Sequence, residues 1–500
     1  MERDEATLAS REAAESAPAS AADLLDLLVR AQEEADAGAS RDEIAERLAH
    51  LRDTVAHVDP SVLERLEGEI ACRITEIDEI VSDQVNEILH AEPFQKLEAS
   101  WRGLHYLVTR CDTSSMLQIR VLNMSKDDLR RDLESAVDFD MSVLFQKVYE
   151  EEYGVLGGDP FAVLIGDYEF SHHPDDVALL ERCANVSAAA HAPFISAASP
   201  QLFGWDSFEE LGVPRDLSRI FSGSDYVKWH SFRAHPDSRY VALTLPRILM
   251  REPYDPETMP VESFCFREDL AGPGRAKYLW GNAAFAFGVC LAAAFARHSW
   301  CAMIRGVDGG GMIDNLPGAH YGTGEDAPPA KAPTEVSISD LCEKDLADLG
   351  FIPIVHRKGT GSAVFYSAQS CQIQERYASE EATASSRLST QLQYILCVSR
   401  FAHYLKVIVR DKLGSLSTPE EIQSHLRTWL LQYSVGNPED LGPEEQARRP
   451  LKDADVQVSA TPGQPGRFEA TIFLQPHYLL DQINVSLQLR TALPSSVDVR

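Results

Sequence analysis

The residues best suited to chemistry form one short run, 171–176 (SHHPDD). Two imidazoles and two carboxylates close together are typical ligands of a transition metal. Side chains of adjacent histidines diverge in most backbones, however, and Pro174 indicates a turn. We therefore expect Asp175 or Asp176 to cap a following helix by accepting a hydrogen bond from a backbone N–H, and we predict no metal site.

Two glycine-rich segments, 306–311 (GVDGGG) and 359–362 (GTGS), resemble phosphate-binding loops in composition. A P-loop needs Gly-Lys-Ser/Thr after its first glycine, and a dinucleotide site needs G-x-G-x-x-G. Neither segment contains either pattern. Turns or tight backbone packing are the expected role of these glycines, and no cofactor is predicted.

The remaining catalytic candidates are weak. Asp167 and Glu169 are two residues apart at a strand end and could face one side, but nothing nearby indicates a sugar site. Cys301 follows Trp300 in an apolar run and is expected in the core. The sequence contains no G-x-S-x-G elbow, H-E-x-x-H or EF-hand loop. We therefore predict a protein that is not an enzyme and has no catalytic residue.

Composition describes an ordinary globular chain of 500 residues, 44% hydrophobic and 25% charged, long enough for two to four domains. Its net charge of −31 argues against binding nucleic acid or an anionic membrane surface. The charge is explained either by solubility or by a positively charged partner surface. Aromatic and basic residues adjoin at Trp101-Arg102, Lys228-Trp229, Phe232-Arg233 and Arg400-Phe401, as at subunit interfaces or in local packing.

The compartment is predicted to be the cytoplasm. The first ten residues are acidic and polar, whereas a secretion signal is basic and then apolar. The nine cysteines are scattered, odd in number and without a C-x-x-C pair, so neither disulfides nor a zinc site are indicated. No apolar run reaches the roughly 20 residues that span a bilayer, so no membrane insertion is expected.

The N-terminal part divides into an arm and a long helix. Residues 1–60 form an acidic arm that is predicted to be partly disordered. A long helix is predicted from Ser61, where Ser61 and Glu64 fit a capping box. Its apolar stripe either packs on the chain's own core or pairs with a helix of another subunit. The candidate partner-helix face consists of Leu63, Leu66, Ile70, Ile74, Ile77 and Val81, and the stripe continues to Val85 and Ile88.

The rest of the chain predicts a mixed α/β (α+β) fold. Residues 61–375 combine the long helix with a central α/β region, which has strands expected at 161–165, 240–245, 301–307, 351–355 and 363–366. Residues 380–500 combine a helix at 385–413 and a helix starting at Thr418-Pro419 with a three-stranded antiparallel sheet. Its last strand is the candidate inter-subunit strand, with Ile483, Val485, Leu487 and Leu489 on one face.

Several long blocks resemble one family, the large sheath subunit of the bacterial type VI secretion system, called TssC, VipB or ImpC. The blocks, in family order, are 94–107 (FQKLEASWRGLHYL), 144–153 (LFQKVYEEEY), 164–170 (LIGDYEF), 189–199 (AAHAPFISAAS), 240–249 (YVALTLPRIL), 278–285 (YLWGNAAF), 300–311 (WCAMIRGVDGGG), 349–356 (LGFIPIVH) and 394–412 (YILCVSRFAHYLKVIVRDK). The resemblance covers about residues 60–494 and leaves out the N-terminal arm.

The resemblance implies a building block of a large assembly. In this family the subunit pairs with a small sheath protein, TssB or VipA, and the heterodimers stack into a helical tube around an inner Hcp tube on a baseplate. Contraction propels the inner tube, and the AAA+ unfoldase ClpV disassembles the contracted sheath. Neighbouring subunits share a sheet, which is the reason to consider the last strand as a link.

Two other classes of protein remain as alternatives. One is an enzyme that uses the 301–311 glycine loop, against which the missing lysine already counts. The other is a soluble adaptor or scaffold that never polymerises.

Overall fold

The computed structural model describes residues 60–155, 157–213, 215–261, 264–271, 275–321, 330–375, 377–412, 418–437, 440–460, 468–476 and 487–492. These residues form two compact units. One contains the long helix up to Ala91 together with residues 254–271, and the other contains the remainder of the chain.

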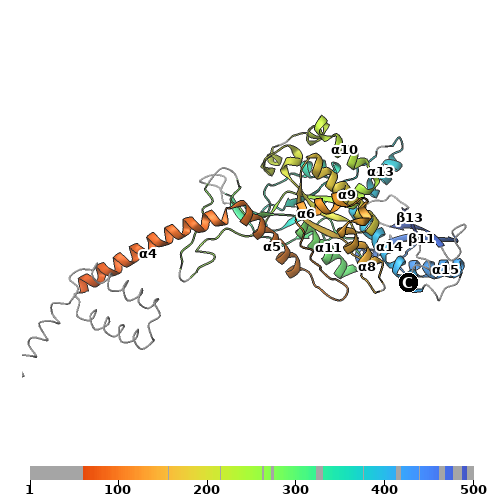
Figure 1. Ribbon diagram of the computed structural model, residues 1–500, viewed down its shortest axis with the longest axis horizontal. Helices are drawn as coiled ribbons and strands as arrows, with labels where there is room; N and C mark the ends of the chain where they lie inside the picture. The colour runs from red at the N-terminus through yellow and green to blue at the C-terminus, as the bar shows by residue number, and fades with distance from the viewer. Residues whose placement is uncertain are drawn as a thin grey trace, which may run out of the picture. The chain divides into compact units, whose positions relative to one another are not determined.

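The first unit is built on α4 (Pro60–Leu89), a single helix of 30 residues, which confirms the long helix predicted from Ser61 (Figure 1). Near its C-terminal end, the Asp269 backbone N–H donates to the Asn86 side chain at 3.0 Å. His90 Nε2 lies 3.3 Å from a Glu268 carboxylate oxygen. The side chains of residues 60–67 lie outside the described residues, so the Ser61 capping box stays a prediction.

A six-stranded sheet organises the second unit. Its order is β1 (Leu164–Phe170), β2 (Phe194–Ala198), β3 (Val241–Leu245), β9 (Ile352–His356), β10 (Ala363–Phe365) and β6 (Met312–Ile313). Neighbours among the first four strands are parallel, and β10 is antiparallel to both β9 and β6. Every residue of β2, β3 and β9 is buried, as expected for parallel strands covered on both faces.

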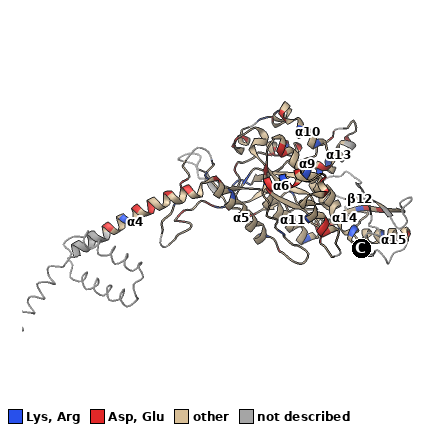
Figure 2. Ribbon diagram, viewed as in Figure 1, with Lys and Arg blue, Asp and Glu red and all other residues tan. Residues whose placement is uncertain are grey.

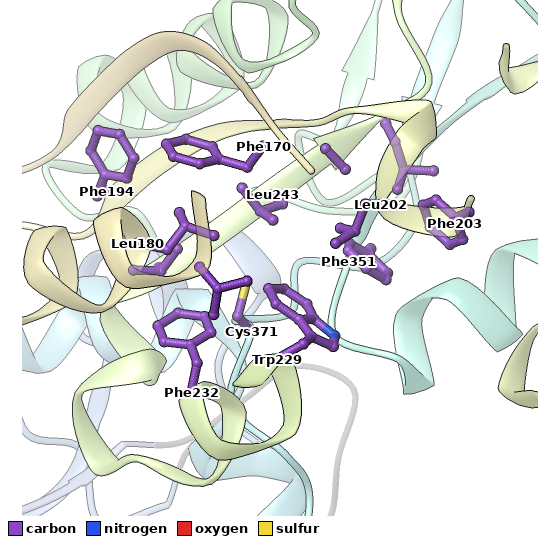
Figure 3. Packing of buried hydrophobic residues seen from close by; sticks show 14 of the residues in the cluster. Phe170, Leu180, Phe194, Leu202, Phe203, Trp229, Phe232, Leu243, Phe351 and Cys371 are labelled. Carbon is purple, nitrogen blue, oxygen red and sulfur yellow. The ribbon is translucent and has the colours of Figure 1, made fainter. Parts of the chain in front are cut away.

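One face of this sheet packs against α9 (Pro174–Ala190), α10 (Val227–Ala234) and several short 3₁₀ helices. Aromatic rings dominate the contact (Figure 3). Phe351 lies between Phe203 and Trp229, with ring centroids 5.2 and 6.1 Å away, and the Trp229 and Phe351 rings are nearly parallel. Large buried rings of this kind contribute more apolar area than any other side chains.

The opposite face packs against α5 (Glu92–Arg110) and α11 (Ala284–His298). Successive strand residues divide between the two sides, since Phe194 belongs to the first cluster and Ile195 to the second. The two helices approach closely at Gly103, where an added Cβ would lie 2.4 Å from the Phe285 ring. A glycine is therefore required at this crossing.

The C-terminal region contains α13 (Glu380–Ser389), α14 (Leu392–Lys412), α15 (Pro419–Leu431) and α16 (Pro443–Arg448). An antiparallel sheet follows, with the order β11 (Leu451–Ala460), β12 (Phe468–Pro476) and β13 (Leu487–Ala492). Thr418 and Glu421 form a capping box at the start of α15, with Pro419 in the first turn. This confirms the predicted helix start and the predicted sheet.

The remaining described elements are short. They are α6 (Lys126–Ser135), η1 (Phe139–Met141), α7 (Val143–Phe145), the π-helix η2 (Gln146–Glu150), α8 (Glu151–Tyr153), η3 (Pro200–Phe203), η4 (Phe208–Gly212), η5 (Leu217–Ser222), η6 (Ser224–Tyr226), η7 (Pro236–Tyr240), α12 (Asp340–Asp348), and the strand pairs β4 (Ile248–Leu249) with β5 (Trp280–Gly281) and β7 (Ala319–Tyr321) with β8 (Ala330–Ala332).

The mixed α/β class is confirmed, but the strand predicted at 161–165 is displaced, since β1 runs over Leu164–Phe170, and two other predicted elements are wrong. Residues 301–307 form no strand, because this segment turns at Gly306, whose φ is +74°. The helix predicted at 385–413 is two helices, α13 and α14. It is interrupted where the Thr390 carbonyl accepts from the Ser370 N–H at 2.9 Å and the Leu392 N–H donates to Ala368 at 2.8 Å.

Within the described residues, one segment of α14, Leu392–Arg410, is long and apolar enough to cross a membrane by length and composition. About two thirds of it is buried inside the protein. It packs against α15 and the C-terminal sheet around Phe401, whose ring stacks on Trp300 with centroids 4.2 Å apart. These contacts identify α14 as a core helix.

Basic side chains of α14 also pack against the central region. His403 Nε2 donates to the Ala190 carbonyl at 2.9 Å, and Lys406 Nζ donates to the Tyr149 hydroxyl at 2.6 Å. Burial lowers the pKa of His403 to about 3, and the nearby cations act in the same direction. Burial and the Lys406 charge lower the pKa of His191 to about 4. Both histidines are therefore neutral in the folded protein at pH 5 to 8.

Acid should destabilise this contact between α14 and the central region. Below pH 6.5 the unfolded chain binds protons at His191 and His403 that the folded chain does not bind. The free energy of unfolding should then fall by about 1.4 kcal/mol per histidine for each pH unit down to about pH 4. Lys406, with its pKa lowered to about 8, is protonated in both states over this range and adds no slope.

Urea unfolding at pH 7, 6 and 5 measures the slope. In His403→Gln the amide can still donate to the Ala190 carbonyl but does not titrate, so the slope should decrease by about one proton. An unchanged slope in this variant would contradict the assignment.

Candidate assembly surfaces

The apolar stripe of α4 is exposed. Ile74, Ile77 and Ile88 are 53%, 57% and 56% exposed, and Val81 is exposed as well. Ile70 is half-buried, and the side chains of Leu63 and Leu66 lie outside the described residues. The described part of the stripe therefore does not pack into a core within its own unit. A row of exposed isoleucines is typical of a surface that another protein covers.

Acidic residues recur along the described length of α4 (Figure 2). Between residues 68 and 89 the helix carries Glu69, Glu76, Asp78, Glu79, Asp83 and Glu87, and one basic residue, Arg73. Arg73 forms an ion pair with Glu76 at 2.6 Å, and both side chains are largely exposed. The surface of α4 is consequently apolar on one side and strongly negative elsewhere.

The candidate inter-subunit strand lies at an edge of the C-terminal sheet. Leu487 and Leu489 belong to β13, in register with Leu474 and Ile472 of β12 in the same chain. Strand β12 is central, so β11 and β13 each have one edge without a partner strand among the described residues. Ile483 and Val485 lie outside the described residues. A linking role for this strand stays a prediction.

Among the aromatic members of the four aromatic–basic pairs, only Trp101 is exposed, at 66%. It lies on α5, and its helical neighbour Leu97 is exposed too. Trp229, Phe232 and Phe401 are buried and belong to the core clusters. Sequence alone did not separate the exposed aromatic ring from the three buried ones, because each is followed or preceded by a basic residue in the same way.

The run 171–176 starts a helix, as predicted, but with a different cap. His173 is the N-cap of α9, and its Nδ1 accepts from the Asp175 N–H at 3.3 Å. The predicted cap at Asp175 or Asp176 is wrong, because Pro174 occupies the first helical position and moves the cap to the residue before it. Asp176 instead accepts from the Ser171 backbone and hydroxyl at 2.8 Å and pairs with Lys126 at 2.7 Å.

These contacts have an electrostatic consequence. Burial opposes ionisation, yet the hydrogen bonds from Lys126 and Ser171 hold the pKa of Asp176 below its usual value. Asp176 is thus a structural carboxylate. Across the described residues, no group of three or more His, Cys, Asp and Glu side chains could hold a metal ion.

The 306–311 loop packs against β10. The Gly306 N–H donates to the Phe365 carbonyl at 2.7 Å, and the Phe365 N–H donates to Gly311 at 2.9 Å. An added Cβ at Gly311 would lie 2.5 Å from the Phe365 oxygen. The expectation of tight backbone packing is confirmed for this loop.

A cavity of about 330 Å³ adjoins this loop, between α5 and α11. Its lining includes Arg110, Arg297, Asp308, Asp314 and the Cys290 thiol. Burial raises the pKa of Cys290 to about 12, so a thiolate nucleophile is not available near neutral pH. Burial raises the pKa of Cys301 to the same value, in agreement with its expected core role.

Asp167 and Glu169 do not act as a carboxylate pair. Glu169 accepts two hydrogen bonds from the Arg247 guanidinium, at 2.6 and 2.8 Å. Asp167 accepts a hydrogen bond from the Ser100 hydroxyl. Each carboxylate therefore has its own partner. Ser100 joins Asp167 of β1 to α5, and Arg247 joins Glu169 of β1 to the segment after β3.

Comparison with known proteins identifies the family to which this chain belongs. The tail sheath N-terminal domain of the VipB (EvpB) family matches residues 71–372, and the tail sheath gpW/gp25-like domain of that family matches residues 381–493. The Type VI secretion system sheath protein TssC1 of Pseudomonas aeruginosa is 44% identical over 449 residues, which cover 89% of each chain.

These matches define a tail sheath protein with both of its domains. The chain belongs to the VipB family of sheath proteins, and it is a sheath subunit of the type VI secretion system. The division of the chain into residues 1–60, 61–375 and 380–500 stays a prediction.

Gly311→Ala should destabilise the protein. The new Cβ would meet backbone atoms of Phe365, Arg305 and Gly306 at 2.5 to 2.7 Å, so the loop and β10 must shift, at a cost of about 1–3 kcal/mol. Gly361→Ala is the matched control, because no atom lies within 4 Å of its Cβ position. Thermal unfolding should show a lower Tm for Gly311→Ala and an equal or higher Tm for Gly361→Ala. Equal Tm values for both variants would contradict the packing described.

Proposed function

We propose that this chain is the large building block of a contractile tube. It pairs with the small sheath subunit, TssB or VipA, and the heterodimers polymerise into a helical tube around the Hcp inner tube, on a baseplate. Contraction of the tube propels the inner tube, and ClpV then disassembles the contracted sheath. The observation that carries this proposal is the exposed apolar stripe of α4 in a chain of the sheath family.

The partner-helix face consists of Leu63, Leu66, Ile70, Ile74, Ile77 and Val81. Fully burying an aliphatic side chain contributes about 1.5–3 kcal/mol. Covering Ile74, Ile77 and Val81, the members of this face that are exposed among the described residues, therefore provides a driving force of several kcal/mol for pairing. Part of it is offset by the loss of freedom on association. The small sheath subunit supplies the covering helix.

Contraction requires an interface with two stable packings. A small free-energy difference per subunit sums over a long polymer to useful mechanical work. Subunits must stay connected while their domains move. Main-chain hydrogen bonds of a shared strand provide such a connection, because they do not depend on the positions of the attached domains.

Contraction requires no catalysis by this chain. It takes place in the cytoplasm, and the chain neither binds nucleic acid nor inserts into a membrane. The glycine loop is packed on β10, and Cys290 and Cys301 hold their protons near neutral pH. The net charge of −31 disfavours a polyanionic partner. A polymer that stores its free energy in packing needs no cofactor.

Electron microscopy of the chain co-expressed with the small sheath subunit tests the proposal. Tubes should appear, and the chain expressed alone should be poorly soluble because the stripe of α4 is uncovered. Discrete particles in place of tubes would support the adaptor alternative, as would a stable monomer at high concentration. Nucleotide hydrolysis, or about one zinc per chain that is lost in His172→Ala, would support an enzyme.

The terminal strand of residues 483–490 is proposed to link neighbouring subunits. Its described part, β13, is an edge strand of the three-stranded sheet among the described residues, so it can join a neighbour by exchanging the hydrogen bonds to one adjacent strand. Proline removes a backbone donor and is excluded from paired positions. Val485→Pro should therefore prevent tubes while the heterodimer still forms.

Leu489→Pro is the comparison, since Leu489 pairs with Ile472 of β12 in its own chain. It should reduce soluble heterodimer as well as tubes. Tube length by electron microscopy and heterodimer yield by gel filtration separate the two effects. Intact, contractile tubes from Val485→Pro would show that this strand does not link subunits.

A further inference from the structure

The apolar positions of α4 repeat every eleven residues. They follow steps of 3, 4 and 4, so that residues 63, 74 and 85 begin successive repeats of the stripe at 63, 66, 70, 74, 77, 81, 85 and 88. An eleven-residue repeat has 3.67 residues per turn, close to the 3.6 of a straight helix, and favours a slight right-handed supercoil. A left-handed two-stranded coiled coil needs a seven-residue repeat. The partner of α4 must therefore match the eleven-residue spacing.

The charged residues of α4 restrict the partner further. Glu69, Asp78 and Glu87 adjoin the stripe residues Ile70, Ile77 and Ile88 in the sequence, which places each carboxylate about 100° around the helix from that residue. None of the three carboxylates forms an ion pair with another described residue, and Glu69 and Glu87 are exposed. A helix laid along the stripe would bring its own flanking side chains close to these carboxylates.

A second copy of α4 is a poor occupant for this reason. The helix has eight acidic and two basic residues, and therefore a net charge of −6. Two copies side by side would place like charges opposite one another, which is destabilising. The apolar spacing would match in that pair, so charge is the property that prevents it.

We propose that α4 binds a helix of another protein, one with the same 3-4-4 apolar spacing and with Lys and Arg at its flanking positions. The acidic border of α4 selects this basic helix and prevents α4 from pairing with itself. The heterodimer consequently forms before any contact between identical chains. This inference rests on the proposed function, in which the covering helix belongs to the small sheath subunit.

Charge reversal of the border tests the inference. The variant Glu69→Lys, Asp78→Lys, Glu87→Lys is co-expressed with tagged small sheath subunit, and the retained fraction of soluble chain is measured at 50, 150 and 500 mM NaCl. Retention should fall at least tenfold at 50 mM, whereas wild-type retention should decrease as salt screens the attraction.

The matched control is Glu134→Lys, Glu181→Lys, Asp206→Lys. These three side chains are exposed on α6, on α9 and in the loop before η4, and they give the same change in net charge. Its retention should equal that of the wild type. Circular dichroism of the retained and unretained chain checks that each variant is folded.

Two more experiments separate charge from apolar contact. Tagged wild-type chain should retain the reversed variant more strongly than it retains untagged wild-type chain, because reversal makes the two α4 helices complementary, whereas any contact through the strand of residues 483–490 is the same for both. Equal retention of the two chains by tagged wild type, or full retention of the reversed variant by the small subunit, would overturn the inference.

The double variant Ile74→Asp, Ile77→Asp tests the underlying surface. If the small sheath subunit fails to retain this variant but retains the reversed variant, the apolar face is a partner surface and the proposed selection by charge is wrong. If both are retained, α4 is not the partner surface. Both the inference and the proposed role of this helix would then fail, whether or not tubes form.

Discussion

The second unit depends on one constraint, which is that the central sheet must be covered on both faces. Every residue of β2, β3 and β9 is buried, so no side of these strands can meet water. Helices α9 and α10 cover one face, and α5 and α11 cover the other. Buried rings such as Phe351 and Trp229 provide much of the apolar area. This stabilisation largely offsets the conformational entropy lost on ordering the chain.

The long helix α4 follows a different rule. Its isoleucines have the spacing of a buried helix, but the described part of the stripe is exposed. A globular domain gains nothing from such a surface, whereas a polymer subunit gains an interface. The C-terminal sheet provides another site for contact, because β13 has an edge without a partner strand among the described residues. In this account, the covered central sheet stabilises the subunit, whereas the exposed stripe of α4 and the open edge of the C-terminal sheet bind other subunits.

Much of this fold could be predicted from the sequence where local signals are strong. The start of α15 follows from Thr418 and Pro419, and the strands β3, β9 and β10 from their short apolar runs. β2 was missed because its Ala-Ser sequence has little strand preference of its own and is fixed by pairing with β1 and β3. The break before Leu392 depends on a hydrogen bond to Ser370, which is distant in sequence.

For the candidate surfaces, too, the sequence predicted local features but not those that depend on the folded chain. Periodicity identified the stripe of α4 but could not tell whether Ile74 and Ile77 face a core or solvent, because both cases need the same spacing. Ile80, the most exposed large hydrophobic residue described on this helix, falls outside the predicted face. Trp101 could not be separated from the buried Trp229 by composition. Exposure is a property of the folded chain, and only the structure supplies it.

The central claim is that a partner helix covers the stripe of α4. A cryo-electron microscopy reconstruction of the tube formed with the small sheath subunit, at side-chain resolution, tests it most directly. The account predicts a helix of the small subunit packed on Ile74, Ile77 and Val81, with basic side chains near Glu69 and Glu87. An assembled tube in which these isoleucines remain open to solvent would contradict it.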